Sequence, residues 1–199
     1  MGAFSGALNF RRSFVRGRPP TWIKERALKS ISPRRFRPLG RDDARAHGWV
    51  SIIDSLADEL HGQDVFFDDW VALGFRWEER QVSGRDLRVE VAHRLRALKR
   101  ENKRVSPEQR KALKEAVHAE LLVKTPPARK IAELLYSPER AEARVFGATL
   151  KMAEAMAELF ERTFELKMLE ANPGELVRRF DLGELIVRSK STPRLEAAL

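Results

Sequence analysis

The chain has 199 residues, of which 43% are hydrophobic, and it carries a formal net charge of +9. This length and hydrophobic content suffice for one sizeable core and an appended subdomain. They exclude a chain that is disordered throughout. Cysteine is absent, which excludes disulfides, thiolate catalysis and cysteine-based zinc sites. Because no apolar run approaches roughly 18 residues and no secretory signal is recognisable, we expect a cytoplasmic protein without a transmembrane helix.

Positive charge is concentrated in two segments. Residues 1–47 contain 12 basic and 3 acidic side chains, and residues 83–124 contain 12 basic and 6 acidic ones. Residues 48–81, in contrast, contain 2 basic and 8 acidic side chains. Because a strongly basic chain attracts polyanions, we expect a nucleic acid partner in preference to a membrane surface. We expect the fold to bring the two basic segments onto one surface.

The N-terminal part predicts a strand, a helix and a second strand. Loosely alternating apolar residues make residues 4–15 the first strand. Apolar side chains recur with helical spacing over residues 23–31, and Pro33 ends that helix. Residues 47–50, His-Gly-Trp-Val, then lead into a short strand.

A basic segment containing one aromatic residue, Arg34-Arg35-Phe36-Arg37, lies between this helix and the second strand. Aromatic rings among arginines can stack on nucleic acid bases. A ring anchored in the hydrophobic core is the favoured interpretation of Phe36. Arg34, Arg35 and Arg37 are candidate contacts to DNA phosphates.

Six carboxylates in the acidic segment suggest a metal site, since two-metal nucleases gather such side chains around Mg²⁺. They are Asp54, Asp58, Glu59, Asp64, Asp68 and Asp69. Their spacing matches no nuclease motif with a lysine at the expected place, so surface and loop positions are the favoured interpretation. A Mg²⁺-dependent nuclease that uses Asp64, Asp68 and Glu78 stays an alternative.

The middle of the chain predicts a strand followed by two long helices. Residues 71–77 alternate between larger apolar side chains and other residues and form the clearest strand in the sequence. Residues 83–124 predict two amphipathic helices in hairpin order. The second helix has a readable start, since Ser106 and Gln109 form a capping box around Pro107.

Each helix of this arm has an apolar seam and a separate polar face. The seams are Leu87, Val91, Leu95 and Leu98 in the first helix and Leu113, Val117 and Leu121 in the second. At about 100° per residue, the basic side chains of the first helix lie on a different face from its seam. The excess of positive charge is larger than pairing between neighbouring turns requires, which favours phosphate binding. The candidate DNA contacts on the arm are Arg85, Arg88, Arg96, Lys99, Arg100, Lys103, Arg104, Arg110, Lys111, Lys114 and Lys124.

The C-terminal part predicts a hairpin, a helix and a closing strand. Residues 131–136 and 143–146 form the hairpin, and residues 165–169 form the closing strand. Thr149 caps a helix between them, whose sheet-facing side chains are Leu150, Ala153, Met156, Leu159, Phe160 and Thr163. The rest of the chain is a short tail with one strand or helix at residues 182–187.

Searches for catalytic motifs give no match. His47, His61, His93 and His118 are isolated, and the sequence contains no H-E-x-x-H motif, Gly-rich phosphate loop or G-x-S-x-G elbow. We therefore expect a protein that is not an enzyme and has no catalytic residue, metal or cofactor.

The order of these features resembles the recombination-associated protein RdgC family over roughly residues 1–170. The resemblance rests on the basic start, residues 48–50, the Phe/Trp-rich strand, the basic helical hairpin, residues 121–124 and the strand and helix that follow. It implies a non-catalytic, largely sequence-independent protein that binds double-stranded DNA. It also implies a homodimer that closes into a ring around the duplex and restrains the recombinase RecA on the bacterial nucleoid.

The sequence departs from the family pattern in two places. Better-known members continue into a further domain that supplies one of two dimer contacts, so we expect a short form in which ring closure is altered. The family tends to carry Leu-Leu-Pro-Arg-Ala-Phe where this chain has residues 121–126, Leu-Leu-Val-Lys-Thr-Pro. Lys124 keeps the positive charge and Pro126 loses the aromatic ring, which predicts a different or weaker dimer contact.

Together these observations predict an α+β fold with a mixed or antiparallel sheet, packed helices and a protruding, basic two-helix arm. The expected domains are a body of residues 1–82 and 125–172, the arm of residues 83–124, and a tail of residues 173–199. The expected partners are double-stranded DNA, with single strands as a further ligand, a second copy of the chain and RecA. Besides the nuclease, the second alternative to a DNA-binding protein is a basic module that binds an acidic protein.

Overall fold

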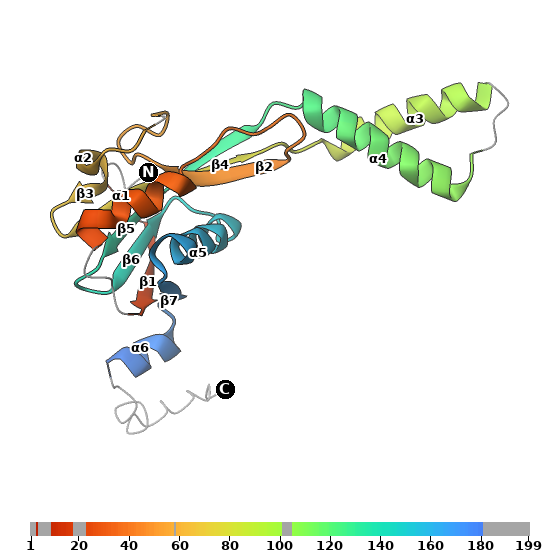
Figure 1. Cartoon of the computed structure of the whole chain (residues 1–199). Coiled ribbons are helices and arrows are strands. Elements are labelled where there is room, and N and C mark those ends of the chain that lie inside the picture. Colours follow the sequence, from red (N-terminus) through yellow and green to blue (C-terminus); the bar gives the residue numbers. More distant parts are fainter. Residues whose placement is uncertain (1–2, 4–8, 18–22, 58, 101–104, 181–199) are drawn as a thin grey trace, which may run out of the picture.

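The computed structural model describes residues 3, 9–17, 23–57, 59–100 and 105–180 (Figure 1). Within these residues seven strands form one sheet, in which the order is β2-β4-β5-β6-β1-β7 and β3 pairs with β4. Every strand pairing is antiparallel, which confirms the expected α+β class. The strands are β1 (Phe10–Arg16), β2 (Arg45–Val50), β3 (Phe66–Phe67), β4 (Trp70–Glu79), β5 (Ala128–Ser137), β6 (Glu142–Phe146) and β7 (Lys167–Glu170).

Two helices cover one face of this sheet, which we call the helical face. They are α1 (Ile23–Ile31) and α5 (Leu150–Phe164), and their buried side chains form one core with those of β4 and β5. The opposite face, called the open face, has no long helix packed against it within the described residues. The remaining helices are a 3₁₀ turn η1 (Ser32–Arg34), α2 (Gly62–Val65), α3 (Gly84–Arg100), α4 (Pro107–Lys124) and α6 (Pro173–Arg179).

Most of the side chains of helix α5 that were predicted to face the sheet do so. Thr149 caps it by accepting a hydrogen bond from the Met152 backbone N–H, and Met156 and Phe160 are buried. The buried Thr163 hydroxyl accepts a 2.9 Å hydrogen bond from the Trp49 indole N–H. Leu150 was expected to face the sheet, but it is 58% exposed because it occupies the first turn, beyond the edge of the core.

Strand β4 is longer than expected and is buried on both faces in its central part. The side chains of Leu73 and Phe75 enter the core on the helical face, as the alternation predicted. Gly74 is also buried, on the open face, because Val50 and Ser51 lie directly over it. A Cβ atom at position 74 would lie 2.7 Å from the Val50 side chain. Loop coverage of the open face was not visible in the sequence pattern.

Gly48 allows the segment after η1 to pass against β2. The backbone N–H of Phe36 donates a 2.8 Å hydrogen bond to the Trp49 carbonyl oxygen. A Cβ atom at position 48 would lie 2.5 Å from the Cα atom and the backbone nitrogen of Phe36. Only a residue without a side chain fits between these two backbone segments.

We expect Gly48→Ala to lower the free energy of unfolding by about 1–3 kcal/mol, since a backbone segment must move to admit the methyl group. Urea denaturation measures this loss. Gly84→Ala is the matched control, because no atom lies within 4 Å of its Cβ position. Equal stability of the two variants would contradict the close approach at Gly48.

Helices α3 and α4 protrude from the body as an antiparallel pair (Figure 1). The predicted capping box is present. The Ser106 hydroxyl accepts a hydrogen bond from the Gln109 backbone N–H, and the Gln109 side-chain oxygen accepts one from the Ser106 backbone N–H. Val117 is the one buried side chain of these two helices, and the remaining seam residues are half-buried. The arm therefore has a thin core of its own.

The ends of the chain differ from the expectations in detail. Strand β1 begins at Phe10, and residues 4–8 of the expected strand lie outside the described residues. Glu165 was expected in the closing strand, but its φ of 59° ends helix α5, so β7 begins at Lys167. Residues 173–179 form α6 where a tail was expected. The expected element at residues 182–187 lies outside the described residues.

Candidate nucleic-acid interface

The arm carries most of the candidate DNA contacts in exposed positions. Helices α3 and α4 contain ten basic and five acidic side chains. Lys103 and Arg104 lie outside the described residues. Nine of the predicted contacts are exposed and form no ion pair with a carboxylate of the described residues: Arg85, Arg88, Arg96, Lys99, Arg100, Arg110, Lys111, Lys114 and Lys124.

Arg94 is the tenth basic side chain of these two helices, and it has a different role. Its two terminal nitrogens donate to the Glu120 carboxylate at 2.9 and 2.6 Å, and its Nε donates to Glu90 at 2.9 Å. These hydrogen bonds raise the pKa of Arg94 and lower that of Glu120. Arg94 therefore joins α3 to α4 across the hairpin, and it pairs with two of the five carboxylates of these two helices.

The basic segment at residues 34–37 lies on the body. Arg34 is half-buried and donates a 3.0 Å hydrogen bond to the Ser30 carbonyl oxygen, whereas Arg35 and Arg37 are exposed. Phe36 was expected in the core, but it is only half-buried, and its ring centroid lies 4.2 Å from the Arg76 guanidinium. A base could stack on that side of Phe36 only after Arg76 moved.

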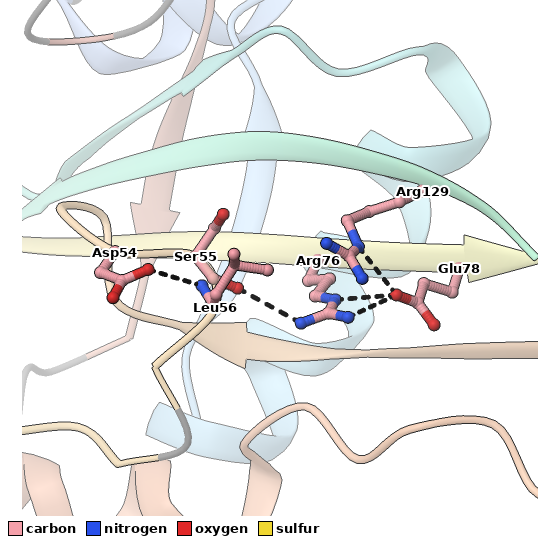
Figure 2. A network of polar contacts seen from close by, with 6 residues as sticks. All are labelled: Asp54, Ser55, Leu56, Arg76, Glu78 and Arg129. Carbon is pink, nitrogen blue, oxygen red and sulfur yellow. Dashed lines mark hydrogen bonds and ion pairs between the residues drawn. The ribbon is translucent and has the colours of Figure 1, made fainter.

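Arg76 belongs to a polar network on the open face, shown in Figure 2. Arg76 and Arg129 both donate to one oxygen of Glu78, at 3.0 Å and 2.9 Å from their Nε atoms. Burial alone would raise the pKa of Glu78, but these hydrogen bonds outweigh burial and the pKa is lowered. Arg76 also donates to the Ser55 carbonyl oxygen, which fixes the loop after β2.

This network bears on the nuclease alternative. Glu78 is 6% exposed at its side chain and its oxygen is shared by two guanidinium groups, so a metal ion would have to displace them. Asp68 precedes the ten-residue strand β4, and Glu78 lies near the other end. At about 3.4 Å per residue the two carboxylates are roughly 30 Å apart. Asp64, Asp68 and Glu78 therefore do not converge.

The other acidic side chains likewise form no cluster in the described part of the chain. No group of three His, Asp or Glu side chains there is arranged to hold a metal ion. Asp54 instead accepts a hydrogen bond from the Leu56 backbone N–H within its own loop (Figure 2). Asp58 lies outside the described residues.

Further cations lie between the segment of residues 34–37 and the arm, and sequence reasoning did not single them out. The Nη1 atom of Arg80 donates to the carbonyl oxygens of Gly40, Arg41 and Asp43 at 2.7–3.0 Å. It thereby holds the loop before β2 at the arm end of β4. Arg41 is exposed on that loop, and it forms no ion pair among the described residues. Only the pairing of β2 with β4 places these groups together.

Other cations at the arm end of β4 are neutralised. Arg45 and Lys151 both donate to one oxygen of Glu79, at 2.8 and 3.0 Å. The hydrogen bond from Arg45 is the main cause that lowers the pKa of Glu79 to about 2, and it outweighs the opposing effect of burial. Glu79 therefore stays ionised at neutral pH.

The two basic segments are not adjacent. Phe36 lies against Trp49, which pairs with Phe75, and the arm begins after the end of β4 at Gly84. At about 3.4 Å per residue this separation is up to roughly 30 Å. Arg41 and Arg80 lie in this interval. A single surface that includes both segments stays a prediction.

Comparison with known families gives a match. Residues 13–177 match the family model described as "Putative exonuclease, RdgC". The chain belongs to the RdgC family. The match covers most of the 199 residues and confirms the resemblance that the sequence suggested. Membership makes this a recombination-associated protein. No curated protein sequence matches the chain.

Residues 121–126, where the sequence was expected to depart from the family pattern, lie at the base of the arm. Helix α4 runs from its N-cap at Ser106 back to the body and ends at Lys124. Pro126 follows between α4 and β5, so the missing aromatic ring would lie at this base.

None of the helices in the described residues is long and apolar enough to cross a membrane.

Proposed function

We propose that this RdgC-family protein binds double-stranded DNA without catalysis and largely without regard to sequence, and that the arm is its main contact. The observation that carries this proposal is the set of nine exposed arm cations that form no ion pair with a described carboxylate. Arg94 fixes the pairing of the two helices, so these cations are displayed on a defined support. Lysine and arginine side chains are common donors to DNA phosphates, and such contacts carry no sequence information directly.

The mechanism is electrostatic. Each phosphate that a lysine or arginine neutralises releases condensed counterions from the duplex, so affinity falls steeply as salt concentration rises. If about six phosphates are engaged, the slope of log affinity against log salt is near −5. Phosphates are the same at every base pair, so affinity depends little on sequence.

The biological effect follows from occupancy of the DNA. A protein that coats the duplex limits the access of the recombinase RecA without any chemical step. The family resemblance favours a homodimer that surrounds DNA on the bacterial nucleoid. Arg37 and Arg41 would extend the contact from the arm onto the body.

The family description favours an exonuclease as the second candidate function. An assay with end-labelled duplex and single-stranded DNA, with Mg²⁺ and with EDTA, distinguishes the two. We expect mobility shifts on duplex DNA with the DNA intact in both conditions. Shortening of the label-bearing strand that requires Mg²⁺ would contradict the non-catalytic proposal, and absence of any shift would contradict DNA binding.

A further inference from the structure

A second group of arginines lies on the open face of the sheet, at the end away from the arm. Its members are Arg12 on β1, Arg140 in the β5–β6 turn, Arg144 on β6 and Arg179 on α6. We call this group the sheet cluster. None of its residues was singled out in the sequence, because four elements far apart in the chain contribute them.

Aromatic rings alternate with these guanidinium groups. Arg144 lies 4.8 Å from the Trp70 ring centroid and 5.4 Å from that of Phe10, so it is held between two rings. Arg140 lies 5.6 Å from the same Trp70 ring. Cation–π contacts of this kind restrict the orientation of a guanidinium plane before any ligand arrives.

The same arrangement is repeated around Phe14. Arg179 lies 4.4 Å from the Phe14 ring centroid, and Arg12 lies 5.6 Å from it. Arg179 also donates a 2.6 Å hydrogen bond to the Arg140 carbonyl oxygen. Through this bond α6 is tied to the β5–β6 turn, and the arginines form one cluster.

One buried carboxylate serves two of these arginines. Glu142 accepts from Arg12 at 2.6 Å and from Arg144 at 2.8 Å, and only 7% of its side chain is exposed. Burial would raise the pKa of Glu142, but the hydrogen bonds from Arg12 and Arg144 lower it. Glu142 is thereby paired with two of the four arginines of the sheet cluster. The Arg12 and Arg144 side chains are still 46% and 30% exposed.

The sheet cluster is well separated from the arm. Arg144 pairs with Leu135, which in turn pairs with Ala72 near the start of β4. At roughly 3.4 Å per residue this position is about 24 Å from the end of β4 that leads to the arm. A ligand that contacts both places must be an extended polyanion.

We propose that the sheet cluster is a second binding site for the phosphate backbone of nucleic acid, separate from the arm. Guanidinium groups bind phosphates through two parallel hydrogen bonds. The aromatic rings and Glu142 hold the guanidinium groups of the sheet cluster in place for contact with a phosphate. The inference rests on the proposed function, since the ligand is the same polymer. It adds a contact on the body, so that the protein engages DNA at two points.

The test compares salt titrations of a duplex of about 30 base pairs, which at roughly 3.4 Å per base pair exceeds the separation of the two sites. The cluster variant is Arg140→Gln with Arg144→Gln. We expect its slope of log affinity against log salt to be shallower than that of the unaltered protein by about 2, because two phosphate contacts are lost. Arg140→Gln alone, at an exposed turn position, is expected to change the slope by about 1.

The matched control is Lys29→Gln with Arg162→Gln, which removes two exposed positive charges from α1 and α5 over the helical face. We expect its slope to equal that of the unaltered protein. Cluster variants that titrate like this control, while arm variants lose affinity, would overturn the sheet cluster alone. Failure of the unaltered protein to bind the duplex would overturn both this site and the proposed function.

Discussion

Reversal of three arm charges, Arg96→Glu, Lys99→Glu and Lys114→Glu, is expected to lower the affinity for duplex DNA by on the order of a hundredfold or more. These side chains are exposed on both arm helices and form no ion pair with any described carboxylate. Their reversal removes three phosphate contacts and adds repulsion. Fluorescence anisotropy on several unrelated duplexes measures the loss, which should be the same on each.

The matched control separates the arm from the net charge of the molecule. Lys29→Glu, Arg162→Glu and Lys167→Glu change three exposed body cations and alter the net charge by the same amount. We expect this variant to keep most of the affinity, because long-range attraction between exposed charges is screened by salt. Equal losses in both triple variants would mean that total charge, not the arm, binds DNA.

Replacement of Glu78 by alanine is expected to lower the free energy of unfolding by about 3–5 kcal/mol. Glu78 is the anionic centre of the network in Figure 2, and Arg76 beside it is only 13% exposed at its side chain. Without Glu78 the Arg76 guanidinium stays buried without a carboxylate partner. Urea denaturation followed by circular dichroism measures the difference.

A double variant tests whether the unpaired charge causes this loss. Arg76→Met combined with Glu78→Leu replaces the buried pair by apolar side chains of similar volume, which is often neutral or stabilising. We expect the double variant to be more stable than Glu78→Ala. If Glu78→Ala loses less than about 1 kcal/mol, the pair behaves like a surface ion pair and its proposed role is wrong.

Local sequence signals predicted α1, α3, α4 and α5 but missed the short helices α2 and α6, although Asn172 caps α6. The capping box at Ser106 and Gln109 and the Thr149 cap each mark a helix start that the structure has. Such signals depend on residues within one turn, so they can be read without the fold. Leu150 was misplaced because helical periodicity gives a face of the helix but does not say where the core ends.

The polar networks were not predictable from the same signals. Glu78 and Arg129 are cross-strand partners in β4 and β5, and the whole arm lies between them in the chain. Alternation along a strand says which face a residue occupies, but not which strand lies beside it. The contact of Arg76 with Phe36 and the loop bound by Arg80 depend on the same unpredicted pairings.

The candidate site was predictable where one helix contains it. Periodicity placed the cations of α3 on a face away from its seam, and the structure has them exposed. The pair of Arg94 with Glu120 required the packing of α3 against α4, which periodicity alone does not give. The arginines of the sheet cluster lie in four places far apart in the chain, so no single segment of the sequence indicated the cluster.

The central claim is that phosphate neutralisation by an ordered set of cations binds this protein to DNA. Its most direct test is the affinity of the unaltered protein for several duplexes of unrelated sequence, titrated with salt. We expect a common log–log slope near −5 on every duplex. A slope near zero, or slopes and affinities that differ strongly between sequences, would contradict it.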